Sequence, residues 1–365
     1  MKTMDPDTIL KTIKRTLKTA RLFDVFWERW IVHGLDKDDL TKARANLNSL
    51  EGWQNTWAKL AEEKERKAGE FESQRNYTEA EEAYRQTALY YNLNYWIDPK
   101  YSREKIHWYK KCLQFMNKAD SLSDIPTTYK TLVLQDQSFC SGRIRVPDNP
   151  QGVIIIVNPI DSSKEELYKY EMEFVQKGFI TMSFDGPGQG ETFLLNDVIG
   201  TRVRWESFIH HLIDFASETY DLPVYLFGTS LAASWVLYGS SNKNVAKAVV
   251  VSPAVELERM NMPGYFMNRM ECSCIVDDKN EEETERSIPK FDSINYHAPV
   301  LVFYGKKDMM ITNEEFSRLF DNISSEKHLV EYEHEGHVCN YKLDEIRKTT
   351  IAWFSGKLTM KEEQR

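Results

Sequence analysis

The stretch that decides the fold is VYLFGTSLA, which spans Val224–Ala232. Its first four residues favour a buried strand, and the residues after Gly-Thr-Ser favour the start of a helix. A serine in such a tight strand-to-helix turn projects from the carboxyl end of a sheet. The backbone there passes close to its neighbours, and Gly228 and Ala232 supply small side chains, with Ala232 in place of a second glycine. The pattern predicts a nucleophilic hydroxyl on Ser230; a plain turn that contains a serine is the alternative.

A serine hydroxyl becomes a nucleophile when a base takes its proton and an acid orients that base. Asp308 lies 78 residues after Ser230, and His337 lies 29 residues after Asp308, each beyond the carboxyl end of a predicted strand. This order of serine, acid and histidine is that of the α/β-hydrolase fold. His334 is an alternative base, but it lies closer to its strand and is expected at the surface. The sequence therefore predicts a triad of Ser230, Asp308 and His337.

An oxyanion hole needs two backbone N–H groups aimed at the developing negative charge. Leu231, directly after the candidate nucleophile, is expected to supply one of them. The other is expected from the loop after the strand at 153–158. Pro159 has no N–H group, so Ile160 is the predicted second donor.

The next residue, Asp161, has two open interpretations. Ser162 and Glu165 match a capping box for the helix expected after this loop, so Asp161 would complement the positive end of that helix. The second interpretation is a catalytic role for the Asp161 carboxyl group in the same loop.

From residue 126 onward, short apolar runs alternate with helical patterns. Such alternation is typical of an α/β fold with a mostly parallel sheet flanked by helices. A hairpin is expected first, with strands at 128–135 and 139–146. The other expected strands lie at 153–158, 180–184, 224–227, 248–251, 300–304 and 329–332, and the expected helices at 163–177, 202–219, 231–238 and 314–320.

A glycine-rich segment, DGPGQGE at Asp185–Glu191, follows the expected strand at 180–184. Its glycines do not have the spacing of a dinucleotide-binding fingerprint that runs into a helix. We expect a rigid loop that lines the edge of the active site.

Residues 1–125 differ in composition from the remainder of the chain. They hold three of the 16 glycines and two of the 12 prolines, but six of the nine tryptophans. Apolar residues recur there at helical spacing without a sustained repeat. We therefore expect a helical cap over 1–125 and a catalytic domain over 126–365. Some cap aromatics are candidates for binding substrate, with packing in a helical core as the alternative. They are Trp53, Trp57, Tyr84, Tyr91 and Trp96.

The overall charge excludes some classes of function. A net charge of -9 lacks the electrostatic footprint of a nucleic-acid or anionic-membrane binder. No apolar run approaches the roughly 20 residues that span a bilayer, and no secretory signal is visible, so a cytoplasmic protein is expected. The five cysteines are scattered and are expected to be free thiols. No metal or organic cofactor is expected.

Four segments together resemble the FrsA-like α/β-hydrolases, the family of the 2,6-dihydroxypseudooxynicotine hydrolase-like enzymes. They are FDGPGQGE at Phe184–Glu191, DSSKE at Asp161–Glu165, GTS at Gly228–Ser230 and GHVC at Gly336–Cys339. The resemblance covers about residues 50–355 and implies an α/β-hydrolase fold with an N-terminal helical cap. The chain departs from the family at Asn158-Pro159, where relatives commonly have glycines.

The triad predicts hydrolysis of an acyl-type substrate through an acyl-enzyme on Ser230. The resemblance implies carbon–carbon cleavage next to a ketone, because several relatives catalyse it and carry an acidic residue where this chain has Asp161. Hydrolysis of an ester or thioester, and acyl transfer or cyclisation, stay open on the same triad. A regulatory binding protein on a hydrolase scaffold also stays open, since FrsA itself is associated with regulatory binding. The expected partner is a small aromatic or polyketide-like molecule, and a homodimer stays open.

Overall fold

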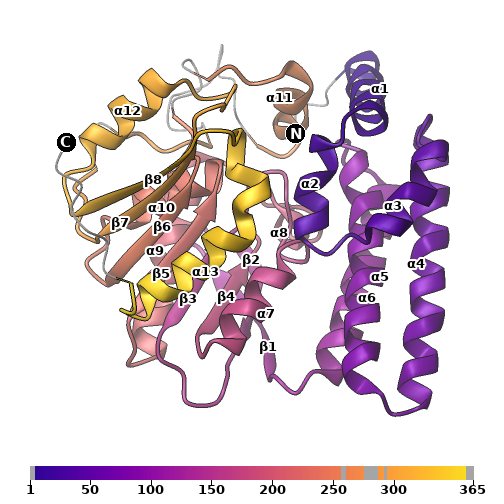
Figure 1. Cartoon of the computed structure of the whole chain (residues 1–365), viewed down its shortest axis with the longest axis horizontal. Helices are drawn as coiled ribbons and strands as arrows, with labels where there is room; N and C mark the ends of the chain where they lie inside the picture. Colours follow the sequence, from indigo (N-terminus) through magenta and orange to yellow (C-terminus); the bar gives the residue numbers. More distant parts are fainter. Residues whose placement is uncertain (1–4, 256–259, 275–286, 292–293, 359–365) are drawn as a thin grey trace. The chain divides into compact units, whose positions relative to one another are not determined.

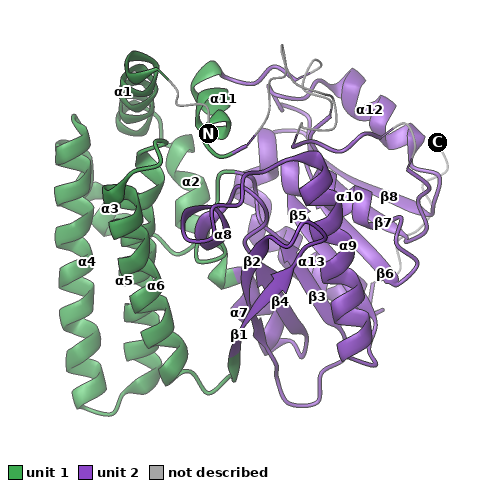
Figure 2. Cartoon of the chain, turned by 180° about the vertical axis from the view of Figure 1, so that it is seen from behind, with its two compact units in different colours: residues 1–127, 161–169, 264–273 green, residues 128–160, 170–263, 274–365 purple. Residues whose placement is uncertain are grey.

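The computed structural model describes residues 5–255, 260–274, 287–291 and 294–358 (Figure 1). The chain divides into two compact units (Figure 2). The first unit comprises residues 1–127, 161–169 and 264–273, and the second comprises 128–160, 170–263 and 274–365. Two short segments from later in the sequence thus belong to the same unit as the N-terminal helices.

The first unit is helical. Asp5 and Pro6 start its first helix as expected from their side chains, since Asp5 accepts a hydrogen bond from the Thr8 N–H at 3.1 Å. The helix α5 lies between α4 and α6 (Figure 1), and residues 87–97 at its C-terminal end are therefore buried on every side. The helices are α1 (Pro6–Leu22), α2 (Val25–Val32), α3 (Lys37–Ala43), η1 (Arg44–Asn46), α4 (Leu50–Ser73), α5 (Tyr77–Ile97), α6 (Arg103–Leu122) and α11 (Gly264–Glu271).

The second unit is built on an eight-stranded sheet with the order β1-β2-β4-β3-β5-β6-β7-β8. β2 runs antiparallel to β4, and every pair from β4 to β8 is parallel. The prediction of a mostly parallel sheet is confirmed. The strands are β1 (Thr127–Val133), β2 (Phe139–Arg145), β3 (Val153–Val157), β4 (Ile180–Phe184), β5 (Val224–Thr229), β6 (Val245–Val251), β7 (Val300–Gly305) and β8 (Lys327–Tyr332).

Helices cover both faces of this sheet (Figures 1 and 2). On one face, Phe227 of β5 packs against α7 and Tyr225 stacks on Phe354 of α13. Side chains alternate along a strand, so Leu226 points to the other face, where it packs against α10 and α9. The helices are α7 (Tyr168–Gln176), α8 (Gly190–Leu194), α9 (Arg202–Thr219), α10 (Leu231–Gly239), α12 (Asn313–Asn322) and α13 (Leu343–Phe354), with the short helix η4 (His337–Lys342).

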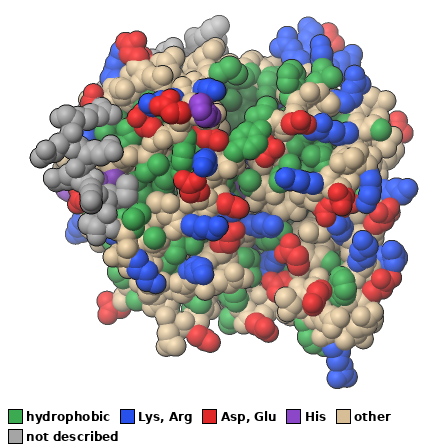
Figure 3. Space-filling model, in the orientation of Figure 1, with side chains coloured by type: hydrophobic (Ala, Val, Ile, Leu, Met, Phe, Trp, Pro, Cys, Tyr) green, Lys and Arg blue, Asp and Glu red, His purple; other side chains and the backbone are tan. Residues whose placement is uncertain are grey.

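The surface charge and the apolar character of the helices can be compared with the expectations from composition. Acidic and basic side chains are interspersed over the face shown in Figure 3. Over the described ranges, none of the helices combines the length and apolar character needed to cross a membrane.

One predicted helix begins later than expected. The sequence indicates a helix from residue 163, but α7 begins at Tyr168, and residues 164–167 form turns instead. Tertiary hydrogen bonds explain the difference: Asn92 donates to the Ser163 hydroxyl at 2.8 Å, and Tyr109 donates to the Glu165 carboxylate at 2.7 Å. These side chains are therefore engaged by α5 and α6 rather than by a helix start.

Candidate active site

The turn after β5 holds Ser230 in a strained conformation. Ser230 has φ 57° and ψ -130° and directly precedes α10. A positive φ is costly for a residue other than glycine, and such strain gathers at functional sites. The Ser230 N–H donates to the Val251 carbonyl at 2.8 Å, which fixes the turn to the end of β6. A Cβ on Gly228 would lie 2.8 Å from Val236 and 2.9 Å from the Ala232 backbone, so this position requires glycine.

Ser230, His337 and Asp308 form one chain of hydrogen bonds. Ser230 Oγ lies 2.8 Å from His337 Nε2, and His337 Nδ1 lies 2.7 Å from Asp308 Oδ2. The other carboxylate oxygen, Oδ1, accepts from the N–H groups of Met310 at 2.8 Å and Ile311 at 3.1 Å. A carboxylate only accepts, so Nδ1 carries the imidazole proton and Nε2 is left to accept from the serine hydroxyl. The structure thus brings the three predicted residues together in the order that proton transfer requires.

The acid and the base of this chain of hydrogen bonds differ in exposure. The Asp308 side chain is fully buried, whereas the His337 side chain keeps 14% of its surface exposed. His334, the alternative base, is exposed on the loop before His337. A buried acid beside a partly accessible base is the arrangement that a catalytic triad requires.

The loop that carries His337 is fastened by a residue that sequence reasoning missed. Val338 has φ 70°, and its N–H donates to the Ser252 hydroxyl at 3.0 Å. Ser252 is buried at the end of β6, has φ 47° itself, and donates its own N–H to the Phe303 carbonyl. Only its position directly after a predicted strand could have drawn attention to it. Ser252 therefore links the ends of β6 and β7 to the histidine loop.

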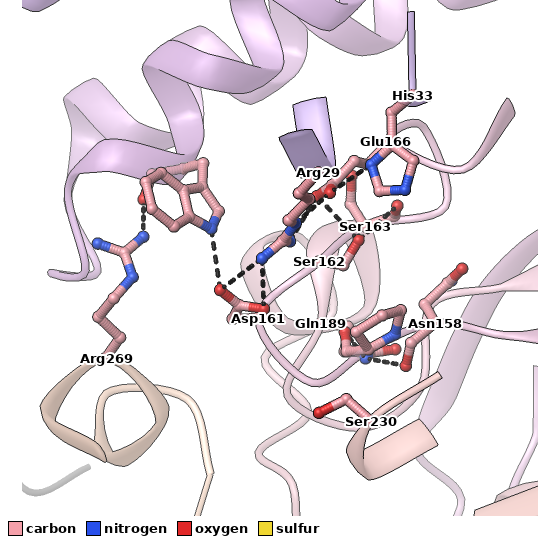
Figure 4. A network of polar contacts seen from close by, with 12 residues as sticks. Arg29, His33, Asn158, Asp161, Ser162, Ser163, Glu166, Gln189, Ser230 and Arg269 are labelled. Carbon is pink, nitrogen blue, oxygen red and sulfur yellow. Dashed lines mark hydrogen bonds and ion pairs between the residues drawn. The ribbon is translucent and has the colours of Figure 1, made fainter. Parts of the chain in front are cut away.

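Gln189, inside the DGPGQGE segment, braces the loop after β3. Its side-chain Nε2 donates to the carbonyl of Asn158 at 2.9 Å and to that of Pro159 at 2.7 Å (Figure 4). Its Oε1 accepts from the Gly186 N–H at 2.8 Å, and the Asn158 amide donates to the Phe184 carbonyl at 2.9 Å. The glycine-rich segment was expected as a rigid lining; the contacts show that its glutamine also fixes two carbonyls of the neighbouring loop.

The two predicted oxyanion donors lie on separate elements of the sheet unit. Leu231 is the first residue of α10, so its N–H has no acceptor within the helix. Ile160 is buried and follows Pro159, whose carbonyl Gln189 holds. The described segments contain no group of three or more His, Cys, Asp or Glu side chains that could hold a metal ion.

Asp161 belongs to the helical unit and is ion-paired there. Arg29 Nη1 lies 3.1 Å from both of its carboxylate oxygens, and Trp96 Nε1 donates to Oδ2 at 3.0 Å (Figure 4). The interpretation of Asp161 as a helix-start charge is wrong, because α7 begins only at Tyr168. The Ser162 hydroxyl, expected as a cap, instead donates to Glu166 at 2.9 Å.

Glu166 shares the same guanidinium. Arg29 donates through Nε at 2.5 Å and Nη2 at 2.8 Å, and His33 Nδ1 lies 2.8 Å from Oε1. Burial raises the pKa of Glu166, but Arg29 and His33 outweigh it and lower that pKa to about 2. Burial likewise lowers the pKa of Arg29, and Asp161 and Glu166 raise it above its ordinary value. No local sequence pattern links residue 29 to residues more than a hundred positions away.

The predicted cap aromatics are buried in the helical unit. Trp53 stacks on Trp27 at 5.5 Å, Tyr84 on Phe115 at 6.1 Å, and Tyr91 on the same ring at 5.6 Å. Such pairs contribute about 0.5–1.5 kcal/mol each beyond burial. Packing therefore accounts for these side chains, and a role in substrate binding stays a prediction.

Trp57 and Trp96 complete the set of predicted cap aromatics. Trp57 packs edge-on against Tyr90, with ring centroids 5.4 Å apart. Trp96 differs from the others because its indole N–H binds Asp161 and the Arg269 guanidinium lies 3.8 Å from its ring centroid. Among the described contacts, it is thus the member of the predicted set that binds Asp161 of the predicted oxyanion loop.

Comparisons with curated proteins found relatives of moderate identity. 2,6-Dihydropseudooxynicotine hydrolase of Paenarthrobacter nicotinovorans is 27% identical over 215 residues, which cover 58% of this chain and 57% of the relative. 20-Hydroxy-prefusarin hydrolase of Gibberella moniliformis is 24% identical over 248 residues, which cover 62% of this chain and 59% of the relative. The chain thus matches less than two thirds of the length of either protein. No protein-family model matches it.

Solved structures extend the similarity over most of the chain. The crystal structure of 2,6-dihydroxy-pseudo-oxynicotine hydrolase has a TM-score of 0.77 at 19% identity and covers 93% of this chain and 100% of the other. Wild-type AbyA5 has a TM-score of 0.68 at 13% identity and covers 92% of this chain and 95% of the other. At these identities the likeness shows the fold, and the prediction of an α/β-hydrolase fold with an N-terminal helical region is confirmed.

Proposed function

We propose, from the premise that this chain is an α/β hydrolase homologous to 2,6-dihydropseudooxynicotine hydrolase, that it hydrolyses a small acyl-type substrate through an acyl-enzyme on Ser230. The observation that carries the proposal is the chain of hydrogen bonds from Ser230 Oγ through His337 to Asp308. The turn at Ser230 also supports the proposal, because a sharp strand-to-helix turn exposes the serine hydroxyl at the end of the sheet and tolerates a strained backbone to do so.

The proposed reaction has two halves. As Ser230 Oγ attacks the substrate carbonyl, His337 Nε2 accepts the hydroxyl proton, and the N–H groups of Leu231 and Ile160 stabilise the oxyanion. The bond to the leaving group then breaks, the leaving group takes the proton from His337, and the acyl group stays on Ser230. A water molecule gives its proton to His337 and its oxygen to the acyl carbon, and Ser230 leaves with the proton returned. Asp308 holds the imidazole and stabilises its charged form throughout.

We propose carbon–carbon cleavage next to a ketone, in an aryl ketone or β-diketone, as the natural reaction. The family resemblance described in the sequence analysis supports this choice, because several members of that family catalyse such a cleavage. Ester or thioester hydrolysis uses the same triad and differs in its leaving group, an alkoxide or thiolate in place of a stabilised carbanion. An activated ester is therefore a suitable assay substrate under either reaction.

The test is labelling with a fluorophosphonate, whose phosphorus is attacked by an activated serine with loss of fluoride. The intact mass should show one adduct on the wild-type chain, and the adduct should be absent in Ser230→Ala and His337→Ala. Peptide mapping should place the adduct on Ser230. A folded wild-type chain that takes no adduct would contradict the proposal and favour a binding protein on a hydrolase scaffold.

Ser252→Ala is expected to lower kcat on an activated ester about 10-fold with little change in KM. The variant leaves the partly buried Val338 N–H without its acceptor, which is expected to cost roughly 0.5–1.5 kcal/mol and to loosen the histidine loop. Ser252→Gly should show the same loss, because glycine relieves the positive φ without restoring the hydroxyl. Ser240→Ala removes another buried hydroxyl of the sheet unit and serves as the matched control. Full activity in Ser252→Gly would show that the hydroxyl is not required.

A further inference from the structure

The loop that carries Ile160 continues directly into residues 161–166, which are held by ion pairs. Asp161 follows Ile160 in the chain, and the Arg29 guanidinium binds both Asp161 and Glu166, five residues later (Figure 4). All three Arg29 nitrogens donate to these two carboxylates. The Asp161 side chain is 7% exposed and that of Glu166 is fully buried, so the two carboxylates are shielded from bulk water. A single side chain of α2 thus fixes both ends of residues 161–166.

Further contacts leave this segment little freedom. Asn92 of α5 holds Ser163, Tyr109 of α6 holds Glu165, and Trp96 holds Asp161. On the other side of Ile160, Gln189 holds the carbonyls of Asn158 and Pro159, as described above. The peptide N–H of Ile160 therefore lies between two fastened stretches of the same loop.

The contacts of Asp161 also determine which chemistry it can perform. Both of its oxygens accept hydrogen bonds from Arg29, and one accepts a further bond from Trp96. Both oxygens of Asp161 are thus engaged as hydrogen-bond acceptors within the helical unit.

We infer that Asp161 and Arg29 are positioning residues that hold the Ile160 N–H in place for the oxyanion, and that Asp161 is not the proton donor to the leaving group. The inference rests on the proposed function, since it assigns a use to the oxyanion loop. It makes α2 of the helical unit part of the machinery that sets the rate on Ser230, without contact with the substrate.

The first experiment measures Asp161→Asn with two reagents whose leaving groups need no proton. They are a fluorophosphonate, read as the rate of adduct formation on Ser230, and p-nitrophenyl acetate, read as kcat and KM. A positioning role predicts that the labelling rate and kcat both fall about 10-fold while KM changes little, because one charged hydrogen-bond network is weakened. A proton-donor role predicts wild-type rates with both reagents, and that result would overturn the inference.

The matched control is Asp120→Asn. Asp120 pairs with Arg85 at 2.8 Å, and both side chains are almost completely buried in the same helical unit. The control thus disturbs a comparable ion pair that lies on other helices, and it should keep wild-type rates. Equal losses of rate in Asp120→Asn and Asp161→Asn would indicate general destabilisation and would also overturn the inference.

The second experiment asks whether the guanidinium itself is needed. Arg29→Ala should lower kcat about 100-fold, and millimolar methylguanidinium should restore at least about 10-fold, because 23% of the Arg29 side chain is exposed and offers an entry. Sodium chloride at equal ionic strength should restore nothing. If Arg29→Ala does not fold, Arg29→Lys replaces it: lysine keeps the charge but cannot bridge two carboxylates, so kcat should still fall about 10-fold. Wild-type rates in the folded arginine variant would contradict the inference.

The two levels of proposal fail separately. A wild-type chain that takes no fluorophosphonate adduct contradicts the proposed function itself. A wild-type chain that is labelled on Ser230, with an Asp161→Asn variant labelled at the same rate, leaves the proposed function standing and removes only the positioning role.

Discussion

Ser230→Ala is expected to lower kcat by about 10⁴- to 10⁶-fold while the chain stays folded. The variant removes the only atom that can form the acyl-enzyme, and His337 then has no hydroxyl to deprotonate at 2.8 Å. The oxyanion donors and the substrate contacts remain, so a small rate above that of water should persist. The measurement is single-turnover and steady-state hydrolysis of p-nitrophenyl acetate, with the mass of the variant checked for contaminating wild-type chain.

The control for this loss is Ser234→Ala, one turn further along α10. Ser234 is buried and donates to the Ala254 carbonyl at 2.7 Å, so its removal disturbs the same helix without touching the triad. Rates should stay within about 3-fold of wild type if helix packing is not the cause. A Ser230→Ala variant that retains more than a few per cent of kcat would rule out the acyl-enzyme and favour direct attack by water.

The triad could be predicted because each member follows a strand of the parallel part of the sheet. Parallel strands direct their carboxyl ends to one edge, so residues that follow β5 and β7 are brought together by topology alone. The order of the residues along the chain then distinguishes the acid from the base. The local turn at Ser230 was equally readable, since Gly228 is required by a close approach that acts within a few residues.

The charged network of the helical unit could not be predicted in this way. Arg29 lies on the short helix α2, whose sequence pattern does not indicate an ion-pair partner. Its two partners, Asp161 and Glu166, follow β3, far along the chain. Ser162 and Glu165 did form a local pattern, the capping box, but it gave the wrong helix start. Long-range hydrogen bonds from α5 and α6 outweighed that local preference, as tertiary contacts often do.

Side chains that hold backbone groups form a second class that sequence reasoning missed. Gln189 and Ser252 each bind main-chain atoms of a distant loop, and main-chain atoms carry no sequence signal. The sequence predicts Gln189 only as part of a rigid glycine-rich loop, with no contact of its own. The reactive groups of the site are thus more predictable than the groups that orient them.

Asp308→Asn is expected to lower kcat by about 10³- to 10⁴-fold, although the side chain changes by only one atom. The Met310 and Ile311 N–H groups both donate to Oδ1, so an asparagine places its amide oxygen there. Its NH₂ group then faces His337 Nδ1 and donates to it. The imidazole proton must move to Nε2, which faces Ser230 and can no longer accept the hydroxyl proton.

This explanation is tested by reading the imidazole tautomer together with the rate. Nitrogen NMR of the wild-type chain should show the His337 proton on Nδ1, and Asp308→Asn should show it on Nε2 with the loop otherwise unchanged. Asp214→Asn, which alters a carboxylate bonded to Asn242 and Asn244 on the same unit, is the control and should keep both properties. Since the triad acts as a unit, Asp308→Asn combined with Ser230→Ala should be no slower than Ser230→Ala alone. A rate within about 10-fold of wild type in Asp308→Asn would instead mean that Ser230 and His337 suffice as a pair, with Asp308 serving only to hold the loop.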